Sequence, residues 1–182
     1  MRTEPAAAAE VVEFWRDAGP QRWFRKDPAF DAQFRDRFAA LHERAAAGEL
    51  DDWLGTPGGT LALAILLDQF PRNAFRGTPR MYATDDRARR IARIALERRL
   101  DEQVPLELRN FIYLPFMHSE DSADQDVAVA RTAALGGDSH CYALHHRDIV
   151  RRFGRFPHRN PVLGRQSTPE EEQFIAQGGF TG

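Results

Sequence analysis

The chain has 182 residues, of which 42% are hydrophobic and 10% aromatic. These values exclude an intrinsically disordered protein. The length predicts a single folded domain over residues 1–182, with its core from about residue 11 to residue 176. The formal net charge of −2 at pH 7 provides no overall field that would attract nucleic acid or an anionic membrane, so we expect neither as a partner.

The location of the protein is predicted from its cysteine and its apolar runs. Cys141 is the single cysteine, so no disulfide can form within the chain, which favours a reducing compartment. Its apolar neighbours predict that Cys141 packs in the core and is not a nucleophile. The acidic residues Glu10 and Glu13 argue against a signal peptide. The longest apolar run, Leu61 to Leu67, is far shorter than the ~20 residues of a membrane span. We expect a cytoplasmic protein.

Taken in chain order, the first elements are predicted to be helices. A helix with one apolar face ends at Gly19-Pro20. Asp27 is placed to cap a second helix with Pro28 at its first position, and Gly48 is placed to close it. We expect His42 of this helix at the surface. Large apolar side chains recur here at three- and four-residue steps and form one stripe: Phe30, Phe34, Phe38 and Leu41.

The next helix is apolar on every side, which predicts a central, buried position. Residues 56–59 are predicted to form a loop, and Thr60 to cap a helix over residues 61–70 that a proline then ends. Asp68 lies near the end of this helix. A buried carboxylate is costly unless it is paired, so we expect a cationic or donor partner. The candidates are Arg72, which is near in sequence, and Arg152, Arg155 and Arg159, which are distant.

The second half of the chain continues the helical pattern. Residues 84–99 form a helix with an arginine-rich face that we expect to be solvated. Pro105 opens another helix, and Ser122 with Gln125 fits a capping box. Thr168–Glu171 is the strongest helix start. No segment alternates with the two-residue period of a strand. We therefore predict an all-α fold of seven to eight short antiparallel helices, arranged as a bundle or a helix-pair solenoid.

Three polar corners stand out from this helical pattern. Gln69–Asn73 and Arg155–Asn160 each combine an aromatic residue, a proline and strong polar groups within about six residues. A third polar cluster, His118–Asp121, follows an apolar stretch that contains a proline. Because such groups are placed at helix ends, we predict that the three corners meet in one enclosed polar site.

The chemistry of these corners leaves three hypotheses open. In the first, arginines of segment 151–160 bind a small anionic ligand or an acidic peptide; they could also pair with the acidic segment 120–126. In the second, His118 acts as an acid or base with Glu120 or Asp121, with or without a metal. The spacing of the histidines supports no metal site. In the third, the polar residues hold the corners together and the function lies with a protein partner.

Several long motifs resemble a known family. They are Trp23-Phe24, Leu66-Leu67-Asp68-Gln69-Phe70-Pro71-Arg72-Asn73, Tyr113-Leu114-Pro115-Phe116-Met117-His118-Ser119-Glu120-Asp121, His146-Arg147-Asp148, Arg152-Phe153-Gly154-Arg155-Phe156-Pro157-His158-Arg159-Asn160 and Leu163-Gly164-Arg165. From residue 11 to residue 174 the chain is similar to an uncharacterised bacterial family called domain of unknown function 924. The resemblance implies an all-helical fold similar to tetratricopeptide-repeat proteins. It supplies no reaction, cofactor or oligomeric state.

The polar residues that match the family's motifs supply the candidate site, together with His146. The candidate catalytic residues are His118, Glu120 and Asp121. The candidate ligand-binding residues are Asp68, Gln69, Arg72, Asn73, Gln125, His146, Arg152, Arg155, His158, Arg159 and Asn160. Of the three hypotheses, we favour the binding protein.

Overall fold

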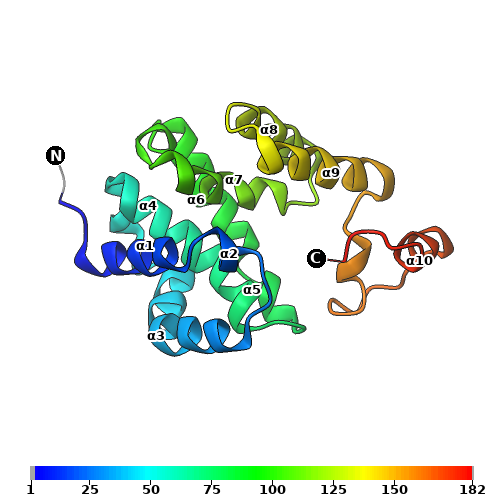
Figure 1. Ribbon diagram of the computed structural model, residues 1–182, viewed down its shortest axis with the longest axis horizontal. Helices are drawn as coiled ribbons and strands as arrows, with labels where there is room; N and C mark the ends of the chain where they lie inside the picture. The colour runs from blue at the N-terminus through cyan, green and yellow to red at the C-terminus, as the bar shows by residue number, and fades with distance from the viewer. Residues whose placement is uncertain (1–2, 182) are drawn as a thin grey trace. The chain divides into compact units, whose positions relative to one another are not determined.

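The computed structural model describes residues 3–181, and this part of the chain contains helices and connecting segments but no strand (Figure 1). The all-α prediction is confirmed. The described residues form ten α-helices, more than the predicted seven to eight. Helices α2 (Pro20–Trp23) and α5 (Phe70–Ala74) are too short to show a helical period in the sequence. The likeness to tetratricopeptide repeats stays a prediction.

The chain divides into two compact units. Unit 1 comprises Met1–Arg76 and Arg80–Pro115, and unit 2 comprises Gly77–Pro79 and Phe116–Gly182. The prediction of a single domain over the whole chain stays a prediction.

Unit 1 contains the first helices of the chain and most of α7. Besides α2 and α5 these are α1 (Ala6–Ala18), α3 (Pro28–Ala47), α4 (Pro57–Ala64), the π-helix η2 (Ile65–Gln69), α6 (Asp85–Glu97) and α7 (Leu106–Met117), with short 3₁₀ turns η1 (Asp51–Gly55), η3 (Pro79–Tyr82) and η4 (Asp101–Gln103). Helix α4 packs against α1 and α6, and α3 packs against α5. The apolar α4 is therefore central, as its sequence predicts.

The aromatic stripe of α3 forms the core of unit 1. Phe34 is fully buried, and its ring centroid lies 5.3 Å from that of Trp15 and 5.2 Å from that of Phe70. The prediction that His42 lies at the surface is wrong, because this residue is only 4% exposed. It follows Phe38 by four residues and so continues the buried stripe.

The predicted start of the central helix is wrong by about one turn. Helix α4 begins at Pro57, and its N-cap is Thr56 instead of Thr60. The Thr56 hydroxyl oxygen accepts a hydrogen bond from the Gly59 amide at 3.1 Å. A capping threonine followed by proline is a strong helix start, and it outweighs the poor helix propensity of the following glycines.

Unit 2 is built around a small apolar core. Its elements beyond α7 are α8 (Ser122–Ala133), α9 (Gly137–Phe153), the 3₁₀ turn η5 (Pro157–Arg159) and α10 (Pro169–Ala176). Helix α8 packs along α9, and α10 contacts η5 (Figure 1). Three buried residues form one core cluster, and three aromatic residues pack partly buried against it: Ile149, Val150 and Phe156, with Phe153, Phe174 and Phe180.

The two helix starts predicted in unit 2 have different outcomes. The capping box at Thr168 is confirmed, since its hydroxyl accepts from the Glu171 amide and the Glu171 carboxylate accepts from the Thr168 amide. The capping box at Ser122 is wrong. Asp121 is the N-cap of α8, and its carboxylate accepts from the Ala123 amide at 2.7 Å. Aspartate is as good a cap as serine, and the helix begins one residue earlier than predicted.

The expectation that Cys141 packs in the core is also wrong, because this cysteine is exposed. The buried residues of α9 are Ala143, His146, Ile149 and Val150, and Cys141 lies off the helix face that they define. In the described residues, no helix has the length and apolar character needed to cross a membrane.

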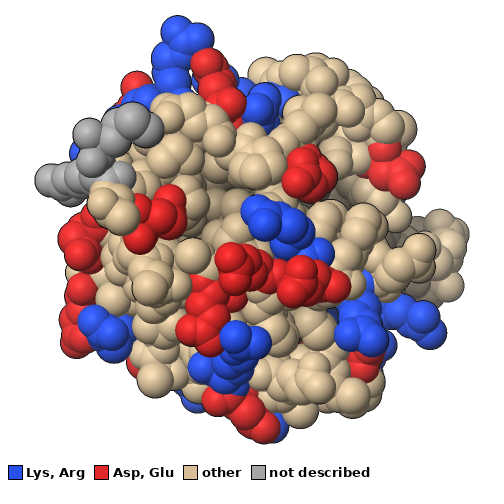
Figure 2. Space-filling view, turned by 60° about the vertical axis from the view of Figure 1, so that its left-hand side comes forward, with Lys and Arg blue, Asp and Glu red and all other residues tan. Residues whose placement is uncertain are grey.

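Charged side chains of both signs share the surface. Figure 2 shows Lys and Arg interspersed with Asp and Glu on the face in view. On α6, Arg87 forms an ion pair with Asp51 and Arg89 pairs with Asp86. Part of the arginine-rich face of residues 84–99 is therefore neutralised by neighbouring carboxylates.

Candidate functional site

The first polar cluster lies at the π-helix η2 in unit 1, where Pro71 follows in the chain. Proline has no amide hydrogen and its ring clashes with the carbonyl four residues earlier in an α-helix. The helix widens here, and the Phe70 amide donates to the Ile65 carbonyl. The carbonyl of Leu66 accepts from His42 Nδ1 at 2.8 Å, and that of Leu67 accepts from the Thr84 hydroxyl at 2.6 Å. Two side chains from other elements therefore supply hydrogen bonds to carbonyl groups of the widened turn.

Arg72 ties this turn to α6. Its guanidinium is 3.1 Å from a carboxylate oxygen of Asp68 and donates two hydrogen bonds to Asp85, at 2.9 and 3.0 Å. Asp68 and Asp85 are 1% and 7% exposed. Burial acts to lower the pKa of Arg72, but the two carboxylates outweigh it and raise that pKa. The predicted pairing of Asp68 with Arg72 is confirmed.

The two predicted amide residues of this cluster also bind their neighbours. Gln69 Nε2 donates to Asp68 at 2.6 Å. Asn73 Nδ2 donates to the Gln69 carbonyl at 2.9 Å, and the Asn73 side-chain oxygen accepts from Arg76 at 2.6 Å. These contacts hold the π-helix in place. They hold together the π-helix cluster (His42, Asp68, Gln69, Arg72, Asn73, Thr84 and Asp85), and the ligand-binding role predicted for Asp68, Gln69, Arg72 and Asn73 stays a prediction.

The second polar feature is an ion-pair network in unit 2. Glu120 accepts two hydrogen bonds from Arg165, at 2.7 and 2.9 Å, and a third from the Phe156 amide at 2.8 Å. Burial acts to raise the pKa of Glu120, but these donors outweigh it and hold that pKa below its ordinary value. Glu120 therefore fixes the segment after α9 to the start of α8.

Glu171 is the other centre of the ion-pair network. It accepts two hydrogen bonds from Arg155, at 2.6 and 2.8 Å, and one from Asn160 at 3.2 Å. The bonds from Arg155 lower the pKa of Glu171 to about 2, although burial acts in the opposite direction. Asn160 in turn accepts from Arg165 Nε at 2.9 Å, which links the two carboxylate centres.

This network changes the pairing that the sequence predicts. Segment 151–160 contacts segment 120–126 through Arg151, which pairs with Asp126 at 2.9 Å, and through the Phe156 amide. Arg152 and Arg155 pair with α10 instead, with Glu170 and Glu171. Three predicted ligand-binding residues, Arg152, Arg155 and Asn160, thus already bind protein groups, and an anionic ligand would have to compete with them.

The third polar feature is a histidine cluster in unit 2 (His118, His145, His146, His158 and Arg159). The ring centroids of His118 and His146 are 6.3 Å apart, and those of His145 and His146 are 6.4 Å apart. Arg159 donates to the His118 carbonyl at 2.9 Å, and its guanidinium lies 4.6 Å from the Phe156 ring centroid. His158 joins through the same Phe156 ring, at 5.7 Å. Four predicted site residues therefore come together here from α9, η5 and the end of α7.

His146 is the most perturbed member of the histidine cluster. Its Nδ1 is 2.8 Å from the Tyr142 carbonyl oxygen. Because a carbonyl only accepts, Nδ1 carries the hydrogen and Nε2 holds a lone pair. Burial, together with the charges of His118, His145 and Arg159, lowers the pKa of His146 to about 3. The imidazole is therefore neutral at pH 7.

Two other predicted residues support the backbone of unit 2. Gln125 is fully buried, and its Nε2 donates to the carbonyls of Met117 at 2.7 Å and Ser119 at 2.6 Å. These bonds satisfy the C-terminal end of α7. Asp121 caps α8, so its carboxylate is engaged with backbone amides. The catalytic role predicted for His118, Glu120 and Asp121 stays a prediction.

Two of the three polar corners that were predicted to meet are in contact. In unit 2, corners 118–121 and 155–160 are in contact through Glu120 with the Phe156 amide and through Arg159 with the His118 carbonyl. The corner 69–73 belongs to unit 1, and its meeting with the other two stays a prediction.

Sequence reasoning misses several partners in these clusters. Arg165 is absent from the candidate residues. Its place in the family motif Leu163-Gly164-Arg165 could have identified it as a site residue. The sequence around Asp85 indicates a helix start and does not indicate its pairing with Arg72. The pairing of Glu171 with Arg155, and the approach of Phe180 to the imidazoles, join segments that no local pattern connects.

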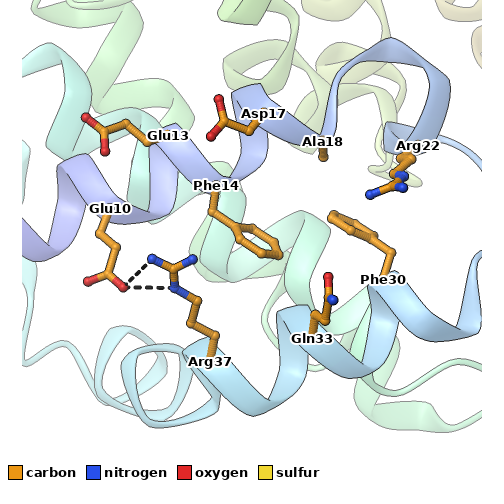
Figure 3. A pocket seen from close by; sticks show the side chains of 9 residues that line it. All are labelled: Glu10, Glu13, Phe14, Asp17, Ala18, Arg22, Phe30, Gln33 and Arg37. Carbon is orange, nitrogen blue, oxygen red and sulfur yellow. Dashed lines mark hydrogen bonds and ion pairs between the residues drawn. The ribbon is translucent and has the colours of Figure 1, made fainter.

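Two hollows of the surface lie in unit 1. A groove of about 210 Å³ runs between α1 and α3 (Figure 3), and the rings of Phe14 and Phe30 stack in it at 5.4 Å. Arg37 forms an ion pair with Glu10 at its edge. A second hollow of about 430 Å³ is lined by Thr3, Pro5, Asp52 and Thr56. Neither is lined by a predicted site residue.

Within the described part of the chain, no three His, Cys, Asp or Glu side chains are arranged to hold a metal ion.

These features define an all-helical protein with buried polar clusters in each of its units. Residues 11–179 match the family described as "Bacterial protein of unknown function (DUF924)", and the chain belongs to this family. A solved structure of a protein of unknown function from Agrobacterium tumefaciens is 54% identical and superimposes with a TM-score of 0.94. That alignment covers 95% of this chain and 98% of the other. No curated protein matches the chain.

Proposed function

We propose that the protein binds a small anionic molecule at the histidine cluster of unit 2. The observation that carries this proposal is the gathering of basic side chains from three elements, with Arg159 only 7% exposed. The guanidinium of Arg159 supplies a positive charge beside the imidazoles of His118 and His146, and His146 becomes a donor to an anion when its Nε2 takes up a proton. Such groups together are suited to a phosphate or carboxylate.

Electrostatics supports the same proposal. His118, His145 and Arg159 each disfavour a positive charge on His146. An anion beside His146 would offset the positive charges that lower its pKa, and it would gain binding energy in a region where little water screens the charges. The carboxylates of the ion-pair network have their main partners elsewhere, since Glu120 is held by Arg165 and Glu171 by Arg155, although the charge of Arg159 also helps to lower the pKa of Glu120.

Acid–base catalysis is the second candidate function, favoured by the proximity of His118 to His146. A pKa of about 3 makes His146 a weak base at neutral pH. A catalytic function would therefore depend on His118. The metal-assisted form is tested by elemental analysis of the purified protein.

The third hypothesis, a protein partner, suits the structural role of the ion-pair network. For the location, we propose the cytoplasm, on the basis of the lone cysteine.

The test is a titration of the protein with inorganic phosphate, sulfate and citrate against sodium chloride of equal ionic strength. We expect the imidazole NMR signals of His118, His146 and His158 to shift, and the pKa of His146 to rise as an anion removes repulsion. His42 in unit 1 is the internal control and should not respond.

Two matched variants locate the site. Arg159→Gln removes the buried guanidinium and should weaken binding roughly tenfold or more, the value of a lost charge-assisted hydrogen bond. Arg151→Gln removes the same charge from an exposed pair with Asp126 and should change the affinity little. Equal losses in both variants would indicate non-specific attraction. No response of the imidazoles to any of the three anions would refute the proposal.

A further inference from the structure

The ring of Phe180 lies against the histidine cluster. Its centroid is 4.6 Å from that of His146, 5.1 Å from that of His158 and 5.8 Å from that of His145. All three pairs are edge-to-face, with interplanar angles of 63°, 82° and 77°. Three imidazoles therefore surround one flat aromatic ring, which the chain itself supplies.

Two glycines deliver this ring. Gly178 has a φ of +83°, and its amide donates to the Ile175 carbonyl at 3.1 Å. The Gly179 amide donates to the Phe174 carbonyl at 2.9 Å, and a side chain on Gly179 would collide with the Phe174 ring. The end of α10 therefore turns sharply and directs Phe180 toward α9.

The ring is held less firmly than the helix before it. Helix α10 is fixed by the capping box at Thr168 and by the pairing of Glu171 with Arg155. Beyond Gly179, Phe180 makes ring contacts, and its backbone forms no hydrogen bond with other described residues. Phe180 is only partly buried. Burial of such a ring contributes about 1–2 kcal/mol, an amount that a bound ligand can exceed.

We propose that Phe180 is a plug, and that the molecule bound by the histidine cluster is a flat ring that carries an anionic group. The ring of the ligand takes the place of Phe180 among the three imidazoles, and its anionic group lies toward Arg159. This inference rests on the proposed function, and it adds the class of ligand and the segment that must move. His146 is 6% exposed and the Phe180 ring lies against it, so the ring of a ligand enters this space only if Phe180 leaves, whereas an anion without a ring does not need that space.

The test compares phenyl phosphate with inorganic phosphate in two variants. Phe180→Ala opens the place of the ring and should tighten phenyl phosphate at least tenfold while changing the affinity for inorganic phosphate less than about twofold. Phe24→Ala is the matched control, because this ring lies in unit 1, where it is 67% exposed and stacks on Phe111 at 5.9 Å. It should change neither affinity.

Phe180→Trp provides a second measurement that keeps a ring in place and so protects the fold. The three native tryptophans lie at positions 15, 23 and 53, and their signal is subtracted with the wild-type protein. Phenyl phosphate should shift the added emission to the red as the indole leaves the imidazoles for water. Inorganic phosphate should leave the emission unchanged.

The outcomes separate the two proposals. Both probes could bind while phenyl phosphate and inorganic phosphate give the same affinity change in Phe180→Ala and the same emission in Phe180→Trp. That result would refute the plug and leave anion binding standing. If phenyl phosphate binds no tighter to a folded Phe180→Ala protein than to the wild type, the plug is likewise refuted. If neither probe binds to any variant, the proposed function fails as well.

Discussion

Unit 1 and unit 2 solve the same problem, a polar cluster inside a helical protein, in different ways. Unit 1 surrounds the π-helix cluster with aromatic and aliphatic side chains, and its central helix is buried on every side. Unit 2 has a small apolar core and fixes the long connection between α9 and α10 by two carboxylates, Glu120 and Glu171, each held by an arginine. Packing dominates the first unit and charge the second.

The two units are therefore sensitive to different changes. In unit 1, loss of a charge leaves its partners in a place that water does not reach, which is costly. In unit 2, the pKa values of Glu120, Glu171 and His146 are all lowered, so acid should weaken this unit. Four substitutions test whether burial or surface charge decides stability.

The largest effect is expected from Arg72→Ala in unit 1. The variant leaves Asp68 and Asp85 buried without this partner, which should lower the free energy of unfolding by about 3–5 kcal/mol. Arg44→Ala, in an exposed pair with Glu49, is the control and should cost no more than about 1 kcal/mol. Urea unfolding followed by tryptophan fluorescence measures both. Equal small losses would show that the buried pairing is weak.

The next effect is expected from Glu171→Gln in unit 2. The pKa of Glu171 is lowered from 4.5 to about 2, so its stabilisation is present above pH 4.5 and is lost as the pH falls toward 2. At pH 7 the substitution should cost about 2–3 kcal/mol, and the cost should vanish in acid. Glu170→Gln, whose pair with Arg152 is exposed, should show a much smaller loss. A loss that stays constant with pH would contradict the ion-pair explanation.

A smaller effect, limited to mild acid, is expected from His146→Gln. The pKa of His146 is about 3 in the folded protein, whereas an imidazole free of these neighbours has a pKa of 6.5. The unfolded chain therefore binds the proton first, and stability falls as the pH drops from 6.5 toward 3. The wild type should lose about 2 kcal/mol more than the variant between pH 7 and pH 5. His145→Gln, at an exposed position, should keep the wild-type slope.

The smallest effect is expected from Arg151→Ala. Its pair with Asp126 is exposed on both sides, and such pairs contribute about 0–1 kcal/mol. High salt should remove even this contribution, while it should affect Arg72→Ala little. A loss above about 2 kcal/mol would mean that exposed charges matter more in unit 2 than their geometry indicates.

The same measurements test the single-domain prediction. All three tryptophans lie in unit 1, and His145, His146 and His158 lie in unit 2. Tryptophan fluorescence therefore reports unit 1, and the imidazole NMR signals report unit 2. Coincident transitions in urea would confirm one domain, and separate transitions would establish two.

Much of the local structure could be predicted from the sequence because its causes are local. The spacing of Phe30, Phe34 and Phe38 fixes a buried helix face, and the capping box at Thr168 fixes a helix start. The errors at Thr56 and His42 concern positions where the sequence does carry a usable local signal. The burial of His42 follows from the stripe, and Thr56-Pro57 is itself a start signal.

The helical class, the caps at Asp27 and Thr168 and most of the buried faces follow from the sequence alone, since these depend on periodicity and on bonds within a few residues. The sequence also determined the family, through motifs that mark the polar corners. Tertiary structure decided which arginine meets which carboxylate, and which ring lies on His146. Arg155 with Glu171, Arg165 with Glu120 and Phe180 with His146 join residues 16 to 45 positions apart. Which of several arginines or rings becomes the partner depends on how the helices pack. Side chains of one chemical type are equivalent in the sequence, and only the fold brings one of them within reach.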